Sequence, residues 1–569
     1  MGVEMAAKES RERTRSASAI RETSRRPLRI FAFDPMADRF RDPTISRVTY
    51  ERLDPGPRGR LVEVFDFDSA ENLVWPAIDL DDPDILITQG LAPSESDFRF
   101  HQQMVYAVSM RVLEVFERGL GRPIDWEGLP RLWLLPHADR MQNAYFQPDQ
   151  FALMFGSFLA HPEDPGQNLA GQQVFTCLSY DVIAHEICHP VMWRMRPWEH
   201  DDLSDVADTL AFHEGMADLV ALLARFDEPD VVARTVRERG NDLVGSELLQ
   251  IAMQFGQASD IGAALRVFPD VPDPERYTTE TEPHARGKLL TSAIVQAFVL
   301  ALQEQTADLV RLSGGTGGFR HPDLVRRLAA EASTLAAAVL RVAVCAMDYL
   351  PPVGVRFFDV LRAMLTSDIM LFGRHHRRFR ALLVDAFHSR GLIPSEAGSL
   401  AVDALVLKPV LHPIPEVLPY AADALLHTVR ALEWRRLHMV GTTMLEEMRT
   451  TLLDEQESRR TTWIPAIERF ARKHADALGL APRVAVHAHN LVGTNQIDSG
   501  GNLVARIAVT LVQHGNRTRA VGGVTLVCDS EGTVQFVIGD SPSAAERRRV
   551  PVALTPSQRD LIAAVKGAH

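Results

Sequence analysis

Two short runs of the chain carry residue types suited to binding a metal ion and activating water. In the first, DVIAHEICHP, the spacing of His185 and His189 puts both imidazoles on one face of a helix, with Glu186 beside them. The second, HEGMADLVALL, adds Glu214 and, one helical turn later, Asp218. Two imidazoles and one carboxylate leave a coordination position of Zn²⁺ open to water, whereas structural zinc sites are usually closed by four protein ligands. The pattern therefore predicts Zn²⁺ bound by His185, His189 and Glu214, with Glu186 as general base.

Residues within and next to these runs affect the orientation of the histidine ligands and the shape of the helix that carries them. Asp218 is predicted to accept a hydrogen bond from the free ring nitrogen of a metal-bound histidine, which fixes the tautomer of that histidine. The apolar run 182–184 fits a buried active-site helix. Pro190 removes a helix amide and clashes with the preceding turn, so we expect the helix to kink or end there. The alternative is an ordinary core helix followed by a solvated acidic face.

Together the two runs resemble the zinc-binding motifs of the gluzincins, and specifically those of the thermolysin family. The resemblance spans residues 96–395. It implies an α+β fold with a β-rich upper lobe and a mainly helical lower lobe. It also implies zinc-dependent hydrolysis of a peptide or protein substrate. The connection of 25 positions from His189 to Glu214 is longer than in thermolysin relatives and is nearer to the fungal (fungalysin-type) gluzincins.

The segment 282–287 (EPHARG) opens a long apolar helix. It resembles the segment of the same family that carries a histidine downstream of the zinc ligands. The resemblance implies that His284 stabilises the oxyanion of the tetrahedral intermediate, with Glu280 or Glu282 orienting its ring. Arg286 would bind a substrate carbonyl or carboxylate through its planar guanidinium. The alternatives are a helix-entry histidine with no catalytic task and a surface cation.

The substrate side of the site is predicted from one match and one departure. Asn143 and Ala144 resemble the edge strand on which these enzymes hydrogen-bond the substrate backbone. The fungal gluzincins also use a tyrosine shortly before the third ligand, and the stretch 190–213 contains none. Tyr277 and Tyr349 are possible substitutes, although nothing in the sequence brings either to the metal.

Composition narrows the class of protein. The chain has 569 residues, of which 46% are hydrophobic and 24% charged, as in an ordinary soluble globular protein. A net charge of −13 argues against nucleic acid as a partner and gives no basic surface for membrane adhesion. The four cysteines show no paired spacing, which fits a reducing compartment and a cytoplasmic location. No apolar run of 18 residues occurs, so no membrane-spanning helix is expected. The oligomeric state is left open.

Composition, hydrophobic periodicity and the span of the resemblance divide the chain into four segments. They are a disordered leader (1–27), a β-rich region that is a small domain or an extension of the catalytic lobe (28–95), the zinc peptidase domain (96–395) and a C-terminal α+β domain (396–569). Within the third segment we expect a helix from about 100 to a glycine at 121, a zinc helix (172–196), a third-ligand helix (213–225) and a helix after His284 (286–304).

Three functions are compatible with these observations. The first is a zinc peptidase, most simply an endopeptidase. The second is a gluzincin-like scaffold that binds peptides or proteins without cleaving them, which Pro190 and the missing tyrosine favour. The third, a structural zinc domain, is disfavoured because the chain has no cysteine-rich site.

Overall fold

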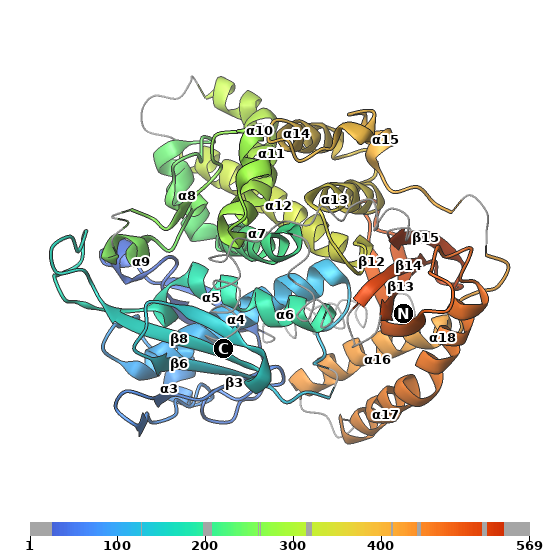
Figure 1. The fold of residues 1–569 in the computed structure, drawn as a ribbon. Helices are drawn as coiled ribbons and strands as arrows, with labels where there is room; N and C mark the ends of the chain where they lie inside the picture. The colour runs from blue at the N-terminus through green and yellow to red at the C-terminus, as the bar shows by residue number, and fades with distance from the viewer. Residues whose placement is uncertain are drawn as a thin grey trace, which may run out of the picture.

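The chain folds as a mixed α+β protein (Figure 1). The computed structural model describes residues 25–126, 128–196, 207–259, 261, 263–313, 321–410, 414–440, 445–514 and 520–539. A sheet from the first third of the chain lies on one side of α5 and α6, and a group of helices that includes α7, α11 and α12 lies on the other (Figure 1). A second sheet with its own helices forms the C-terminal part (Figure 1).

The first sheet has five strands, of which four follow the order β3-β6-β8-β7, and the fifth, β9, pairs with the last residues of β8. The strands are β3 (Val62–Val64), β6 (Leu132–Asp139), β7 (Ala144–Gln147), β8 (Ala152–Leu159) and β9 (Gln173–Phe175). β3, β6 and β8 are parallel, and β7 and β9 run antiparallel to β8. Since β3 comes from the predicted β-rich region 28–95, part of that region extends this sheet.

The remaining N-terminal elements are short. They are β1 (Arg25–Ile30), α2 (Pro35–Asp38), β2 (Thr44–Thr49), β4 (Phe67–Asp68), β5 (Leu73–Val74) and α3 (Pro83–Ile87). β1 pairs with β2, and β4 with β5. The predicted leader 1–27 is wrong at its end, because residues 25–27 pair with β2 through backbone hydrogen bonds. Its residues 1–24 lie outside the described part of the chain.

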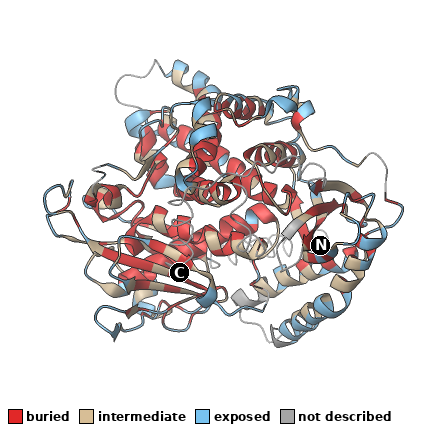
Figure 2. Ribbon diagram, viewed as in Figure 1, coloured by how far each residue is buried: buried red, intermediate tan, exposed pale blue. Residues whose placement is uncertain are grey.

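The long helix α4 (Phe98–Leu120) joins the sheet to the helical part. It begins where the Asp97 side chain accepts a hydrogen bond from the amide of Arg99 and ends at Gly121, whose φ of 66° is left-handed. The predicted helix ending at residue 121 is therefore confirmed. Nearly all of α4 is buried, and it contacts β3 and β6 as well as α5, α7 and α12 (Figure 2).

The helical part covers most of residues 207–405. Its helices are α7 (Ala207–Ala224), α8 (Pro229–Arg239), α9 (Met253–Ala258), α10 (Pro274–Thr279), α11 (Pro283–Leu312), α12 (Pro322–Ala346), α13 (Phe357–Phe372), α14 (Arg377–His388) and α15 (Val402–Leu405), with a small hairpin of β10 (Gln250–Ile251) and β11 (Arg266–Val267). The third-ligand helix and the helix after His284 both exist and are longer than predicted.

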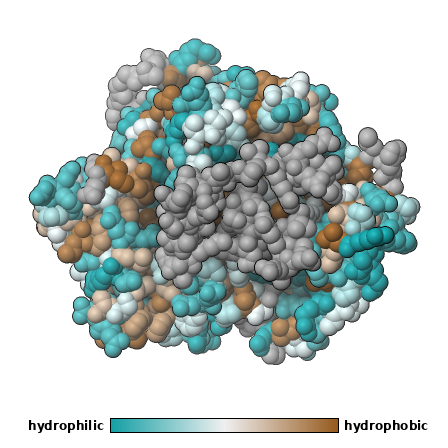
Figure 3. Space-filling view, in the orientation of Figure 1, coloured by the Kyte–Doolittle hydropathy of each residue, from teal (hydrophilic) through white to brown (hydrophobic). Residues whose placement is uncertain are grey.

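Two of these helices have the length and composition of membrane spans. They are α11 and the helical stretch Pro322–Tyr349, whose most apolar windows are 78% and 61% buried within the protein. Burial of this extent is what the core helices of a folded domain show. On the face drawn in Figure 3, polar residues surround small separate groups of apolar ones.

The C-terminal part has its own apolar cluster, distinct from the main core. Its helices are α16 (Ala421–Val440), α17 (Leu445–Ser458) and α18 (Ile464–Lys473). They are followed by four antiparallel strands in sequence order, β12 (Ala485–Ile497), β13 (Leu503–His514), β14 (Ala520–Cys528) and β15 (Val534–Gly539). This order of helices before strands is the one predicted for the segment 396–569.

α7 and α11 approach each other closely at two glycines. A methyl group added to Gly287 would lie 2.7 Å from the carbonyl oxygen of Ala211, and one added to Gly215 would lie 2.8 Å from the carbonyl oxygen of Gly287. The two backbones are therefore in direct contact next to Glu214, whose Cβ is 3.0 Å from the same methyl position on Gly287. The absence of side chains at these positions sets the distance between the helices.

Gly287→Ala is expected to lower the free energy of unfolding by about 1–3 kcal/mol, because the new methyl group must push α7 and α11 apart. Chemical denaturation followed by circular dichroism measures this. Gly522→Ala is the matched control, since no atom of the described residues lies within 4 Å of the position its methyl would take. Equal stability of the two variants would contradict the proposed helix contact.

Candidate metal centre

The run DVIAHEICHP forms two short helices and not one continuous helix. α5 (Tyr180–Glu186) and α6 (Cys188–Met195) are interrupted at Ile187, and residues 173–178 of the predicted zinc helix form β9 and a 3₁₀ turn, η2 (Thr176–Leu178). Pro190 lies in the first turn of α6, where a proline is tolerated because its missing amide has no helical partner. The expected kink therefore falls one turn before Pro190. The rings of His185 and His189 remain adjacent, with centroids 5.0 Å apart.

His185 is held between two carboxylates of α7. Its Nδ1 lies 2.9 Å from Asp218 Oδ1, and its Nε2 lies 3.1 Å from Glu214 Oε2. Asp218 is fully buried, so its contact with the imidazole is shielded from water. This geometry directs Nε2 of His185 toward Glu214 and leaves Nδ1 to the supporting carboxylate, which is the arrangement of a metal-bound histidine and its outer partner.

Glu214 also contacts the histidine at the start of α11. Nε2 of His284 lies 3.1 Å from Glu214 Oε2, and Nδ1 of His284 lies 2.9 Å from Glu282 Oε1. Glu282 is the N-cap of α11 and accepts hydrogen bonds from the amides of His284 and Ala285. Of the two candidates for orienting His284, the structure therefore selects Glu282, while the side chain of Glu280 accepts from local backbone amides.

The predicted ligands His185, His189 and Glu214 do not form a single group of ligand atoms within 4.8 Å of one another among the described residues; two overlapping groups instead share His185. Ligand atoms of His185, Glu186 and His189 lie within 4.8 Å of one another, and so do those of His185, Glu214 and His284. Imidazole nitrogens and carboxylate oxygens are ligands that Zn²⁺ accepts, so the residues present fit this ion. Both His189 and His284 are thus available as the second imidazole.

Ion pairing controls the protonation of the group formed by His185, Glu214 and His284. Burial opposes charge on His185, but its hydrogen bonds to Asp218 and Glu214 prevail and raise its pKa to about 10. Burial likewise opposes the charge of Glu214, yet the neighbouring imidazoles hold the pKa of this carboxyl well below its usual range. The pKa of His284 is raised by Glu214 and Glu282 against the effect of burial. Glu214 is therefore a carboxylate that faces protonated His185 and also His284, whose protonated form it favours.

Glu186 and His189 differ from these three residues because burial has the largest effect on the pKa of each. Burial, with a smaller contribution from Glu214, raises the pKa of Glu186 to about 7. Burial lowers the pKa of His189 to about 3, so this imidazole is neutral near pH 7. A neutral imidazole is the form that binds a metal ion, and a carboxyl with a pKa near 7 exchanges a proton readily at neutral pH.

Arg266 is a site residue that the sequence analysis missed. From β11 its NH2 group donates to Asp218 Oδ1 over 2.8 Å, and its charge influences the pKa values of both Glu186 and His284. Its Nε is buried and finds no hydrogen-bond acceptor among the described residues. An isolated arginine in a short strand carries no sequence signal, so only the fold reveals it.

Arg286 does not occupy the position predicted for a substrate-binding residue. Its guanidinium is buried against Asp208, with Nε–Oδ1 and NH2–Oδ1 distances of 2.7 and 2.6 Å. It also donates to the backbone carbonyls of Tyr277 and Glu280, each over 2.7 Å. The prediction is corrected because these donors already serve contacts that tie α7 to α10 and α11.

The two tyrosines considered as substitutes also have other partners. Tyr277 donates its hydroxyl to Asp208 Oδ2 over 2.7 Å, and the hydroxyl of Tyr349 lies 3.1 Å from the sulfur of Met370. Neither contact involves a residue of the metal centre. Neither Tyr277 nor Tyr349 therefore takes the role suggested by the fungal gluzincins.

Asn143 and Ala144 lie where the sheet presents an edge to α5. β7 pairs with β8 on one side only among the described strands, and it contacts α5. Asn143 is exposed, and its carbonyl accepts a hydrogen bond from the amide of Gly156 over 3.0 Å. An unpaired strand edge offers backbone groups to an extended peptide.

Comparison of the chain with protein-family models, with curated proteins and with solved structures gives no match.

Arg286→Ala tests the corrected role of Arg286. We expect a loss of about 3–5 kcal/mol in the free energy of unfolding, because Asp208 would be left as a buried carboxylate without its cation. Arg276→Ala, which removes a 37% exposed partner of Asp270, should cost less than about 1 kcal/mol. If Arg286→Ala kept full stability and instead raised KM for a substrate, the original prediction would stand.

Proposed function

We propose that this protein is a zinc-dependent peptidase of the gluzincin type, in which His185, His189 and Glu214 hold the ion. The observation that carries the proposal is the arrangement around His185, with Asp218 on its outer nitrogen and Glu214 facing its inner one. Bound Zn²⁺ supplies a Lewis acid that polarises a carbonyl and lowers the pKa of water. The other steps belong to the protein's side chains.

Glu186 acts as the general base of the reaction. Its carboxyl is buried beside His185 and His189, and one of its oxygens lies within 4.8 Å of a ring nitrogen of each histidine. It accepts a proton from the attacking water at a carboxylate oxygen and delivers that proton to the nitrogen of the leaving amine. A carboxylate positioned in this way contributes about 10²–10⁴-fold in rate.

His284 and Arg266 supply positive charge where the substrate carbonyl becomes an oxyanion. Glu282 holds Nδ1 of His284, which leaves Nε2 to face the centre. With 52% of its side chain exposed, His284 stands at the boundary with solvent, where a substrate arrives. Arg266 takes the role first given to Arg286, because its buried Nε is a donor without an acceptor in the described structure.

The substrate binds as an extended strand along β7. Asn143 and Ala144 lie at the beginning of this edge, and α5 packs against it. Backbone hydrogen bonds give such binding its affinity with little regard for sequence. The sheet on one side of α5 and α6 and the helices on the other then correspond to the β-rich and helical lobes expected for a thermolysin-like core.

Glu186→Gln is expected to retain the zinc of this centre and to lower kcat for peptide hydrolysis by at least about 10²-fold, because the amide cannot accept the proton. Mass spectrometry of a digested peptide library and metal analysis of the same preparation provide the two readings. Wild-type cleavage by the variant would remove Glu186 as the base. An absence of cleavage by the unaltered, zinc-loaded chain would instead favour a non-catalytic scaffold that binds peptides.

His189→Ala and His284→Ala separate the two overlapping ligand groups. His189→Ala should lose one equivalent of zinc relative to the unaltered chain, since its imidazole is a proposed ligand. His284→Ala should keep that zinc and lose about 2.7–4 kcal/mol of transition-state stabilisation, seen as a fall in kcat with little change in KM. Loss of zinc from His284→Ala alone would assign the ion to His185, Glu214 and His284.

A further inference from the structure

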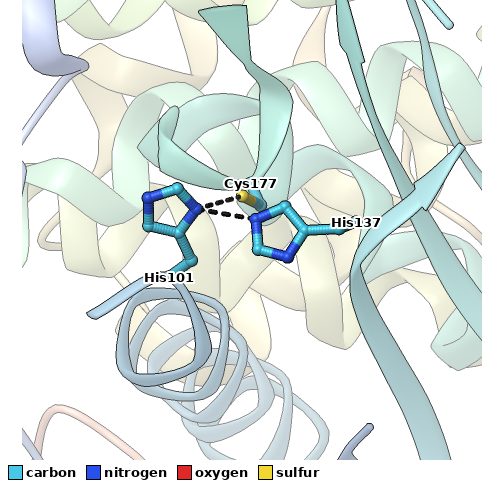
Figure 4. A group of neighbouring side chains, drawn as sticks. All are labelled: His101, His137 and Cys177. Carbon is cyan, nitrogen blue, oxygen red and sulfur yellow. Dashed lines mark hydrogen bonds between the residues drawn. The ribbon is translucent and has the colours of Figure 1, made fainter. Parts of the chain in front are cut away.

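A second cluster of potential metal ligands is buried between α4, β6 and η2. It consists of His101, His137 and Cys177, whose side chains converge on one point (Figure 4). His101 and Cys177 have no exposed surface, and His137 is 4% exposed. Nδ1 of His101 lies 2.8 Å from Nε2 of His137 and 3.7 Å from the sulfur of Cys177. The cluster shares no residue with the centre proposed above.

Hydrogen bonds fix which nitrogen of His137 carries a proton. The amide of Ile78 donates to Gln102 Oε1 over 2.9 Å, which orients the side-chain amide so that Nε2 donates to Asp66 Oδ2 over 2.9 Å. The other oxygen of Asp66 lies 2.6 Å from Nδ1 of His137. Since an ionised carboxylate only accepts hydrogen bonds, Nδ1 of His137 is the donor. In the neutral ring, Nε2 then presents a lone pair.

The same reasoning applies to His101. Its Nε2 lies 3.2 Å from the backbone carbonyl oxygen of Glu95, which can only accept a hydrogen bond. Nε2 is therefore the protonated nitrogen, and Nδ1 presents a lone pair. Two lone pairs of neutral imidazoles thus face each other across 2.8 Å, an arrangement that requires a positive charge or a proton between them.

A shared proton would bridge the two rings, but it leaves the position of Cys177 unexplained. A metal ion accounts for all three side chains, because thiolate sulfur and imidazole nitrogen are preferred ligands of Zn²⁺ and Cu⁺. The outer nitrogens are bonded to a carboxylate and to a backbone carbonyl, which are the usual outer partners of metal-bound histidines. The rings of Phe98 and Phe175 pack on both imidazoles and limit the access of water.

We propose that His101 Nδ1, His137 Nε2 and Cys177 Sγ bind a metal ion of the thiolate- and imidazole-preferring class, Zn²⁺ or Cu⁺. Around a tetrahedral ion, two nitrogens lie about 3.3 Å apart, and a nitrogen and a sulfur about 3.6 Å apart. The observed 3.7 Å already matches the second distance, and the two rings need to separate by about 0.5 Å to match the first. Binding releases the thiol proton of Cys177 to solvent.

The ion would act on the position of the catalytic helix. η2, which carries Cys177, leads through Ser179 into α5, so the ligand precedes His185 by only eight residues. The ion would link this entry to α4 through His101 and to β6 through His137. Its role is to fix the start of α5 against the sheet and the longest helix of the N-terminal half.

Loading the full chain with Co²⁺ tests the proposal. A cobalt–thiolate bond gives a charge-transfer absorption that nitrogen and oxygen ligands do not give. We expect this absorption in the unaltered chain, its loss in Cys177→Ser and its retention in Cys188→Ser. Cys188 is the matched control because it is equally buried but lies beside the other centre, with its thiol bonded to the Ala184 carbonyl.

Two further measurements do not require a folded Cys177 variant. They also identify the metal. Metal analysis after expression should give one equivalent of zinc or copper that persists in His189→Ala. X-ray absorption at the edge of that metal should show a sulfur neighbour at about 2.3 Å if the ion is zinc. No sulfur neighbour and no charge-transfer absorption would overturn the proposal in favour of a shared proton. Loss of the absorption in Cys188→Ser alone would overturn it as well, since the sulfur would belong to the other centre.

Discussion

The contact between α7 and α11 is the constraint on which the geometry of the candidate metal centre depends. Glu214 meets imidazoles from two different helices, and it does so because Gly215 and Gly287 let the backbones touch beside it. A side chain at either glycine would separate Glu214 from His284 by pushing the helix axes apart. The position of the Glu214 carboxylate is therefore set by the packing of α7 against α11. The histidines then contact the carboxylate in that position.

Charge balance explains why the centre tolerates so many buried carboxylates. Glu186, Glu214 and Asp218 lie close to one another, and burying them is costly unless cations accompany them. The protonated imidazole of His185 and the guanidinium of Arg266 provide positive charge, and the raised pKa of His284 favours a further proton there. In the proposed function, a divalent cation held by Glu214 and the imidazoles would displace such protons, so its affinity would rise with pH.

Local periodicity explains which parts of the site were predictable. The contact from Asp218 to His185 follows from two helical motifs, because residues four apart share a face in each helix. The break at Ile187 was anticipated only in part, since Pro190 signals a disturbance but does not fix its position. Arg286 was assigned to substrate because a sequence does not reveal that Asp208 is buried beside it.

The contacts that escaped prediction join segments far apart in the chain. Arg266 reaches Asp218 across 48 positions, and His101, His137 and Cys177 come from a helix, a strand and a turn. No spacing rule relates such residues, so only the packed fold brings them together. The α+β class and the order of elements in segment 396–569 were predictable, because alternating and helical patterns extend over many residues there.

The two clusters lie at opposite ends of α5, and this has a consequence for how the centre is held. α5 has only seven residues, too short to be stable by itself, so its position depends on its neighbours. At its end, His185 is held by Asp218 and Glu214 of α7, and near its start Cys177 lies against α4 and β6. Contacts at both ends therefore fix α5 between α7 and the first sheet. The preorganisation of Glu186 as the proposed base would then come from the sheet as much as from the helices that carry the candidate ligands.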